Sequence, residues 1–151
     1  MPGVTPFLWF DGRLAGAVAF YSSVFDDFAL ESSSPGADDD LMSATFVVQG
    51  QRLMAFNGGP HFRFTPAISL FVSCADQAEV DFYWTALSPG GEEGRCGWLT
   101  DQFGLSWQVI PDALGRLLGA PDRERASRVT AAMMAMSKID VGALEAAYGS
   151  D

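Results

Sequence analysis

Three side chains of the sequence could take part in chemistry, and they lie far apart along the chain. His61 is the only histidine, and histidine is the side chain that most readily moves protons or binds metals near neutral pH. Cys96 could act as a nucleophile if a nearby base lowered its pKa. Gln108 places an amide in an apolar, strand-like segment. We take these three residues as weak catalytic candidates.

Each candidate also has a purely structural interpretation. His61 follows a Gly-Gly-Pro turn and could be a connector residue that packs on Phe62 or Phe64. Most free cysteines are small core residues, and a strand amide such as Gln108 can simply satisfy a buried backbone group. A serine hydrolase is disfavoured, because Ser106 does not lie in a Gly-x-Ser-x-Gly elbow.

Composition limits the classes of partner. A formal net charge of -10 would repel a nucleic acid backbone and an anionic membrane surface. No apolar run approaches the roughly 20 residues needed to cross a bilayer, and the N-terminal residues lack the pattern of a secretory signal. Two cysteines outside any Cys-x-x-Cys pair fit reduced thiols. We therefore expect a cytoplasmic protein that binds neither nucleic acid nor membranes.

An internal repeat organises the chain. Thr5-Pro6 precedes a strand-like segment and then a helix-like segment with Phe20-Tyr21, and Thr65-Pro66 precedes the same series with Phe82-Tyr83. Apolar spacing predicts a first helix over 14–25 and strands over 28–33, 42–49 and 51–56. The second half repeats the series with a helix capped by Asp76 and strands over 93–100 and 105–110. Each half therefore reads as one strand, one helix and two or three antiparallel strands.

The last forty residues read as helical. Pro121 fits a first helical position, and apolar residues recur at intervals of three and four after it. Asp140 can cap a final helix that ends at Gly149. The sequence thus predicts that helices follow the second half of the repeat.

Several separated motifs carry a resemblance to a known family: TPFLWFDG, AFYSSVF, FNGGPHFRFTPAISLFV, CGWLTDQFGLSWQVIP and KIDVGALEAAYG. Together they resemble the PhnB-like branch, often labelled demethylubiquinone methyltransferase-like, of the vicinal oxygen chelate superfamily. The resemblance implies an α+β fold with two tandem βαβββ modules, whose curled mixed sheets surround a cavity, plus C-terminal helices. We expect a single domain over 1–151, with module 1 at 3–58, module 2 at 65–111 and a helical tail at 112–151. No Gly-x-Gly-x-x-Gly turn is present to hold a nucleotide-bearing methyl donor.

The resemblance also implies where a metal would sit, with one ligand from each of four strands. These positions fall at or near Thr5, Leu53, Ser69 (or Ala67) and Gln108. Only glutamine is a credible ligand among them, since a divalent transition metal needs several imidazole, thiolate or carboxylate groups. Residues two apart on a strand share a face, which predicts a pocket that is aromatic with a few neutral polar groups. The predicted ligand-binding residues are Thr5, Phe7, Trp9, Asn57, His61, Ser69, Phe71, Ser106 and Gln108.

Two functions remain open from the sequence. The first is a metal-free homodimer that binds a small organic molecule and needs no cofactor. The alternative is a metal-dependent lyase, isomerase or dioxygenase-like enzyme with a degenerate site, in which a divalent metal is held by Gln108, His61 and water or substrate oxygens.

Overall fold

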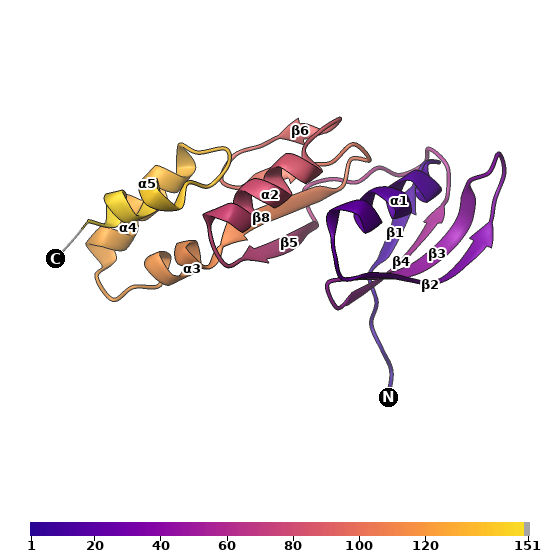
Figure 1. Cartoon of the computed structure of the whole chain (residues 1–151), viewed down its shortest axis with the longest axis horizontal. Coiled ribbons are helices and arrows are strands. Elements are labelled where there is room, and N and C mark those ends of the chain that lie inside the picture. The colour runs from indigo at the N-terminus through magenta and orange to yellow at the C-terminus, as the bar shows by residue number, and fades with distance from the viewer. Residues whose placement is uncertain (150–151) are drawn as a thin grey trace. The chain divides into compact units, whose positions relative to one another are not determined.

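The computed structural model describes residues 1–149 and divides the chain into two compact units, Met1–Phe64 and Thr65–Asp151. We call them unit 1 and unit 2. Each is built on a four-stranded mixed sheet (Figure 1). The boundary falls in the connector that the sequence places between the two halves of the repeat.

Unit 1 follows the order of elements expected for the first half of the repeat. Its strands form sheet A in the order β1-β4-β3-β2, with β1 parallel to β4 and the other neighbours antiparallel. The tight turn between β3 and β4 uses Gln49 and Gly50, both with positive φ, as a two-residue hairpin requires. The elements are β1 (Phe7–Phe10), α1 (Leu14–Val24), β2 (Phe28–Pro35), β3 (Leu41–Val48) and β4 (Gln51–Asn57).

Helix α1 is capped by a residue from a distant loop. Arg13, at the N-cap position, has a left-handed backbone and makes no side-chain cap. The carboxylate of Asp40 instead accepts the backbone N–H groups of Arg13 and Ala15, each at 2.8 Å. The acidic run Asp38–Asp40 thus contributes a helix cap, because the first N–H groups of a helix need an acceptor from outside it.

The two faces of sheet A differ in burial. Alternate residues of β3 and β4, including Phe46 and Leu53, are 0% and 1% exposed, and Phe46 stacks near Tyr21 of α1. The residues between them point to the opposite face, which no helix of unit 1 covers. The apolar alternation of the sequence therefore produces one face packed on α1 and one open face.

Unit 2 repeats this topology. Sheet B has the order β5-β8-β7-β6, again with the first strand parallel to its neighbour, and α2 packs on it. The α+β fold with two βαβββ modules is thereby confirmed. The elements are β5 (Ser69–Cys74), α2 (Gln77–Leu87), β6 (Glu92–Glu93), β7 (Trp98–Thr100) and β8 (Ser106–Pro111).

The single strand predicted over 93–100 is wrong, because β6 and β7 are separate. Cys96 and Gly97 both have positive φ, at 59° and 84°, which no strand tolerates. Their N–H groups donate to the carbonyls of Met136 and Ser137. The chain leaves the sheet here because it pairs with the tail.

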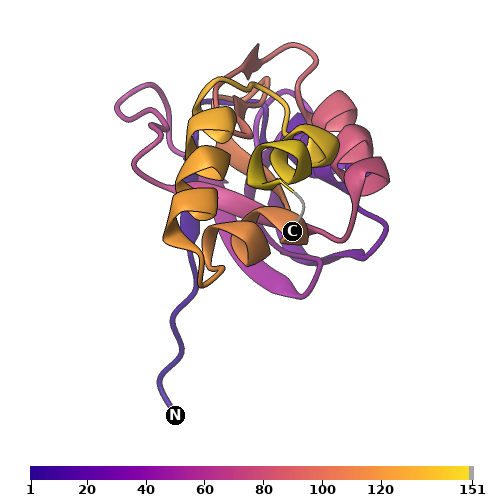
Figure 2. The same ribbon diagram turned by 90° about the vertical axis from the view of Figure 1, so that its left-hand side faces the viewer.

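The tail forms three helices, α3 (Asp112–Leu118), α4 (Arg123–Met134) and α5 (Val141–Tyr148). They gather at one end of unit 2 (Figures 1 and 2). The predicted place of Pro121 in the first turn of a helix is wrong, since α4 begins at Arg123 and Asp122 caps it. The predicted cap at Asp140 is confirmed, with its side chain accepting the N–H of Ala143 at 3.0 Å. The tail core consists of Ile110, Leu114, Leu117, Val129, Ile139 and Leu144.

Over the described residues, none of the helices is both long and apolar enough to cross a membrane.

Candidate functional site

The open face of sheet A carries a continuous row of aromatic side chains. Phe7 and Trp9 of β1 both pack edge-to-face on Phe56 of β4, with ring centroids 5.2 and 4.8 Å apart. Phe62, from the connector after β4, packs in the same way on Trp9 at 4.9 Å. We call Phe7, Phe56, Trp9 and Phe62 the aromatic row. Phe7 is 55% exposed and Phe62 is 64% exposed, so much of this ring surface is free to contact a ligand.

The Gly-Gly-Pro turn holds the indole of Trp9 in place. The indole Nε1–H donates to the carbonyl of Gly59 at 2.8 Å. A Cβ at Gly58 would overlap the same indole ring, so only glycine allows the turn to lie against it. The turn that marks the connector in the sequence thus positions an aromatic side chain of the open face.

Beside the aromatic row, strands β2 and β3 present hydroxyl groups. The ladder pairs Ser32 with Thr45 and Ser34 with Ser43, and the Oγ atoms of Ser34 and Ser43 are 2.6 Å apart. We call these four residues the hydroxyl strip. The same register continues across the sheet, so Thr45 neighbours Met54, which in turn neighbours Phe7.

A hollow of about 180 Å³ lies where the hydroxyl strip meets the aromatic row. Phe7 and Met54 line it together with Ser32, Ser34, Ser43 and Thr45. None of its lining residues is ionisable. Such a surface offers ring contacts and neutral hydrogen bonds, which is the chemistry of a site for a small, partly apolar molecule.

The other predicted residues of unit 1 do not lie on the open face: Asn57 pairs with the buried Phe10 on the opposite side of the sheet, and Thr5 and His61 lie outside the strands. Thr5 precedes β1, which begins at Phe7. Asn57 ends β4 and donates from Nδ2 to the carbonyl of Leu41 at 2.8 Å, while its Oδ1 is buried without a partner among the described residues. His61 lies in the exposed turn after β4. Asn57 therefore links the end of β4 to the start of β3, and His61 lies on the connector rather than on a strand.

In unit 2 the structure brings three of the predicted residues together on sheet B. Gln108 donates from Nε2 to the Oγ of Ser69 at 3.0 Å, and it is the ladder neighbour of Phe71, which is 58% exposed. Ser106 is only 2% exposed, although it belongs to the same side of β8. One N–H of the Gln108 amide is thus already hydrogen-bonded to Ser69.

The positions where the superfamily places metal ligands do not carry a metal-binding set. Leu53 is 1% exposed on the side that faces α1, and its neighbour on the open face is Met54. Across residues 1–149, the structure contains no group of three His, Cys, Asp or Glu side chains that could hold a metal ion. A threonine, a thioether, a serine and an amide do not satisfy a divalent transition metal. The residues present therefore do not fit the metal that the superfamily implies.

The two thiols have different surroundings. Cys74 is 0% exposed, and burial, with smaller contributions from the carboxylates of Glu79, Asp112 and Asp76, raises its pKa to about 11. Cys96 is partly exposed and its Sγ lies 3.8 Å from the Sδ of Met134. Neither arrangement provides the base that a nucleophilic thiol needs.

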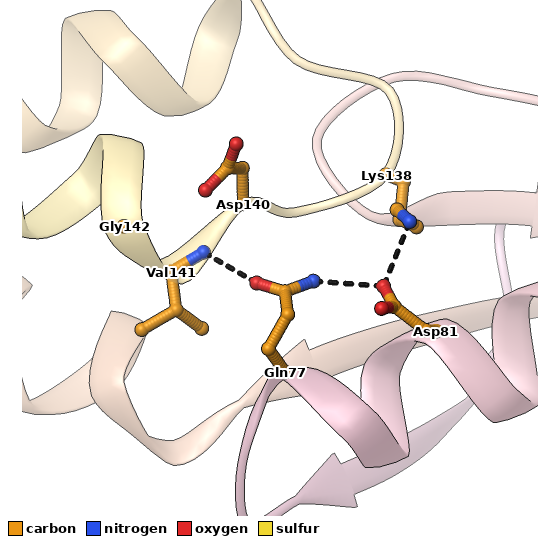
Figure 3. Close-up of a pocket in the computed structure, with 6 residues that line it drawn as sticks. All are labelled: Gln77, Asp81, Lys138, Asp140, Val141 and Gly142. Atoms are coloured by element: carbon orange, nitrogen blue, oxygen red, sulfur yellow. Dashed lines mark hydrogen bonds and ion pairs between the residues drawn. The ribbon is translucent and has the colours of Figure 1, made fainter.

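A second hollow, of about 430 Å³, lies in unit 2 where α2 meets the start of α5 (Figure 3). Its polar side chains bond to each other and to the chain. Gln77 bonds to the backbone of Val141, and Asp81 pairs with Lys138 at 2.7 Å. Because these groups already satisfy each other, we interpret the hollow as a joint between α2 and the tail and not as a binding site.

Sequence reasoning missed the hydroxyl strip. Its signal was readable, since Ser32 and Ser34, and likewise Ser43 and Thr45, recur at the two-residue spacing of a strand face. What the sequence could not supply was the pairing register, which a bulge between Leu30 and Ser32 resets. That shift places the two serines on the open side of the sheet.

Comparison with known proteins identifies the family. A family model described as 3-demethylubiquinone-9 3-methyltransferase matches residues 2–110. The chain belongs to this family. It is the PhnB-like branch of the vicinal oxygen chelate superfamily, as the motifs of the sequence indicate. No curated protein matches the chain.

Solved structures of similar proteins agree with this assignment. The PhnB protein of Bacillus cereus is 31% identical over 73% of this chain and 99% of its own, with a TM-score of 0.67. Protein PA1353 of Pseudomonas aeruginosa is 26% identical over 74% of this chain and 98% of its own, with a TM-score of 0.63. The Arabidopsis thaliana gene product At5g48480, 18% identical over 71% of this chain and 96% of its own with a TM-score of 0.52, shares the fold. The family match ends near β8, so the helical tail lies outside it.

Proposed function

We propose that this PhnB-like protein binds a small organic molecule without a metal, on the open faces of its two sheets. The observation that carries the proposal is the open face of sheet A, where an aromatic row and a hydroxyl strip border one hollow. Ring surfaces left exposed beside neutral hydrogen-bonding groups are typical of small-molecule sites. On sheet B, Phe71 and Gln108 offer the same combination on a smaller scale.

Methyl transfer, the activity in the family's description, has little support in this chain. A nucleotide-bearing methyl donor is usually held at a glycine-rich turn between a strand and a helix. The corresponding turns here are 11–13 before α1 and 75–76 before α2, and they contain a single glycine, Gly12. A metal-dependent reaction also lacks support, because the side chains at the expected ligand positions do not suit the metal.

The test combines metal analysis with ligand screening. Purified protein is exchanged against a chelator and its metal content measured, and thermal shifts are then recorded with zinc, manganese and ferrous iron and with a library of small aromatic compounds. We expect aromatic compounds to raise the melting temperature of the chelated protein and the metals to leave it unchanged. A stoichiometric metal that survives chelation, or ligand binding that needs added metal, would refute the proposal.

The same proposal includes a homodimer in the cytoplasm. Phe7 on sheet A and Phe71 on sheet B are each more than half exposed, and exposed apolar side chains favour association. The free thiols Cys74 and Cys96 suit a reducing compartment. Sedimentation at micromolar concentration should give twice the mass of one chain, and a monomer there would count against the dimer.

A further inference from the structure

We propose that the hollow on sheet A takes an uncharged, single-ring aromatic compound that carries a hydroxyl or carbonyl group. This inference rests on the proposed small-molecule binding and names the class of ligand. Three features of unit 1 support it: the size of the hollow, the absence of charge among its lining residues, and the hydroxyl strip along one side.

The size of the hollow limits the ligand. Its volume is about 180 Å³, and an apolar protein cavity of about 150 Å³ is known to take one benzene molecule. One ring with one or two small substituents therefore fits the hollow. Part of a fused or extended ring system would lie outside a hollow of this volume.

The charge around the hollow disfavours ionised ligands. Arg52, two residues before Met54 on β4, is the nearest cation along that strand, and its guanidinium binds Glu31 at 2.8 Å. The hollow has no ionisable lining residue, and the chain carries a net charge of -10. A carboxylate or phosphate would gain no partner there and would be repelled by the field of the protein. An ammonium group would find no carboxylate among the lining residues.

The hydroxyl strip selects the polar group of the ligand. A hydroxyl both donates and accepts hydrogen bonds. In the Ser34–Ser43 pair one proton lies between the two oxygens, and the proton of the accepting hydroxyl remains for a ligand. Thr45, which stands between Ser32 and Met54 in the ladder, adds a further hydroxyl. A phenol-type hydroxyl or a carbonyl matches such groups, whereas a plain hydrocarbon ring leaves them without a partner.

The ring and the polar edge of such a compound would be recognised by different strands. Phe7 on β1 and Met54 on β4 provide edge and sulfur contacts for a ring. Ser34 on β2 and Thr45 on β3 provide the hydrogen bonds. Because the two sets belong to different strands that line one hollow, substitutions can separate their contributions.

The experiment compares matched probes by titrating the backbone amide signals of the full chain. The probes are p-cresol, toluene, benzoate and benzylamine, and the proteins are wild type, Thr45→Val, Ser43→Ala and the exposed control Thr85→Val on α2. We expect p-cresol to bind wild type with shifts at Phe7, Thr45 and Met54, and benzoate and benzylamine to bind at least tenfold more weakly. Thr45→Val keeps the side-chain shape and should weaken p-cresol about fivefold while leaving toluene unchanged.

Different failures identify different errors. The inference about the ligand class is overturned if p-cresol and benzoate bind equally well. It is also overturned if neither Thr45→Val nor Ser43→Ala changes the p-cresol affinity while both variants keep the wild-type melting temperature. Binding of larger or charged library compounds but not of p-cresol also overturns it and leaves the proposed function standing. If no aromatic compound binds at all, the proposed function itself falls.

Discussion

Replacing Gln77 by alanine should weaken the contact between α2 and the start of α5. The side-chain amide of Gln77 bonds to the backbone on both sides of Asp140, and Figure 3 shows its bond to Val141. Its Oε1 accepts the N–H of Val141 at 2.7 Å, and its Nε2 donates to the carbonyl of Ile139 at 2.9 Å and to Asp81 at 3.0 Å. Truncation leaves two partly buried backbone groups without partners.

The magnitude follows from those two groups. A net hydrogen bond contributes roughly 0.5–1.5 kcal/mol to stability, so the loss of both backbone bonds should lower the free energy of unfolding by about 2 kcal/mol. Asp81 retains its ion pair with Lys138, and that exposed pair adds little. Gln77→Glu should be at least as damaging near neutral pH, because a carboxylate cannot donate to Ile139 and would face the carboxylate of Asp81.

Urea unfolding and amide hydrogen exchange provide the assay. Gln51→Ala is the matched control, since Gln51 is an exposed glutamine whose side chain donates to the carbonyl of its neighbour Arg52. We expect Gln77→Ala to unfold at lower urea and to lose protection at the Val141 amide, while Gln51→Ala changes stability by less than about 0.5 kcal/mol. Equal stability of Gln77→Ala and wild type, with Val141 still protected, would refute the reasoning.

Three further predictions concern other parts of the chain. Burial raises the pKa of Asp40, but its hydrogen bonds to backbone N–H groups lower it by more, so the pKa lies below its usual value. The stability that this carboxylate contributes is therefore present above the unfolded pKa of about 3.9 and is lost as pH falls further. Asp40→Asn should remove this part of the acid dependence, and an unchanged unfolding curve between pH 5 and 2 would contradict it. In a thiol-reagent assay the native protein should react at Cys96 and not at Cys74, whose pKa is raised to about 11, with two thiols reacting only in denaturant. Gly97→Ala should lower the free energy of unfolding by about 2 kcal/mol in a urea titration, a strain of the size expected for forced backbone geometry. The backbone φ is +84°, and the new Cβ would lie 2.7 Å from the Cδ1 of Ile110. Wild-type stability of this variant would show that the loop adapts.

The sequence predicts those parts of the fold that depend on local periodicity. The two βαβββ series, the cap at Asp76 and the cap at Asp140 follow from apolar spacing and from residues three places apart. The break at Cys96 and Gly97 does not, because it depends on carbonyls of the tail about forty residues further along.

The candidate site, too, can be predicted from the sequence only where it depends on a single strand. Strand parity correctly places Phe7 and Trp9 together on one side of β1, since alternation needs only one strand. The hydroxyl strip depends on the pairing of β2 with β3 and on the bulge before Ser32, which is a contact between strands that the sequence of either alone does not specify. The cap on α1 by Asp40 was missed for a similar reason, because helix and carboxylate meet only in the folded chain.

The position of a bound ring tests the central claim most directly. A crystal structure of the chelator-treated chain grown with p-cresol would show it without any assumption about affinity or activity. We predict the ring against Phe7 and Met54, with its oxygen within hydrogen-bond distance of the hydroxyl of Thr45 and with no metal ion beside it. A ring held instead through a metal ion at Gln108 or His61 would contradict metal-free binding on sheet A.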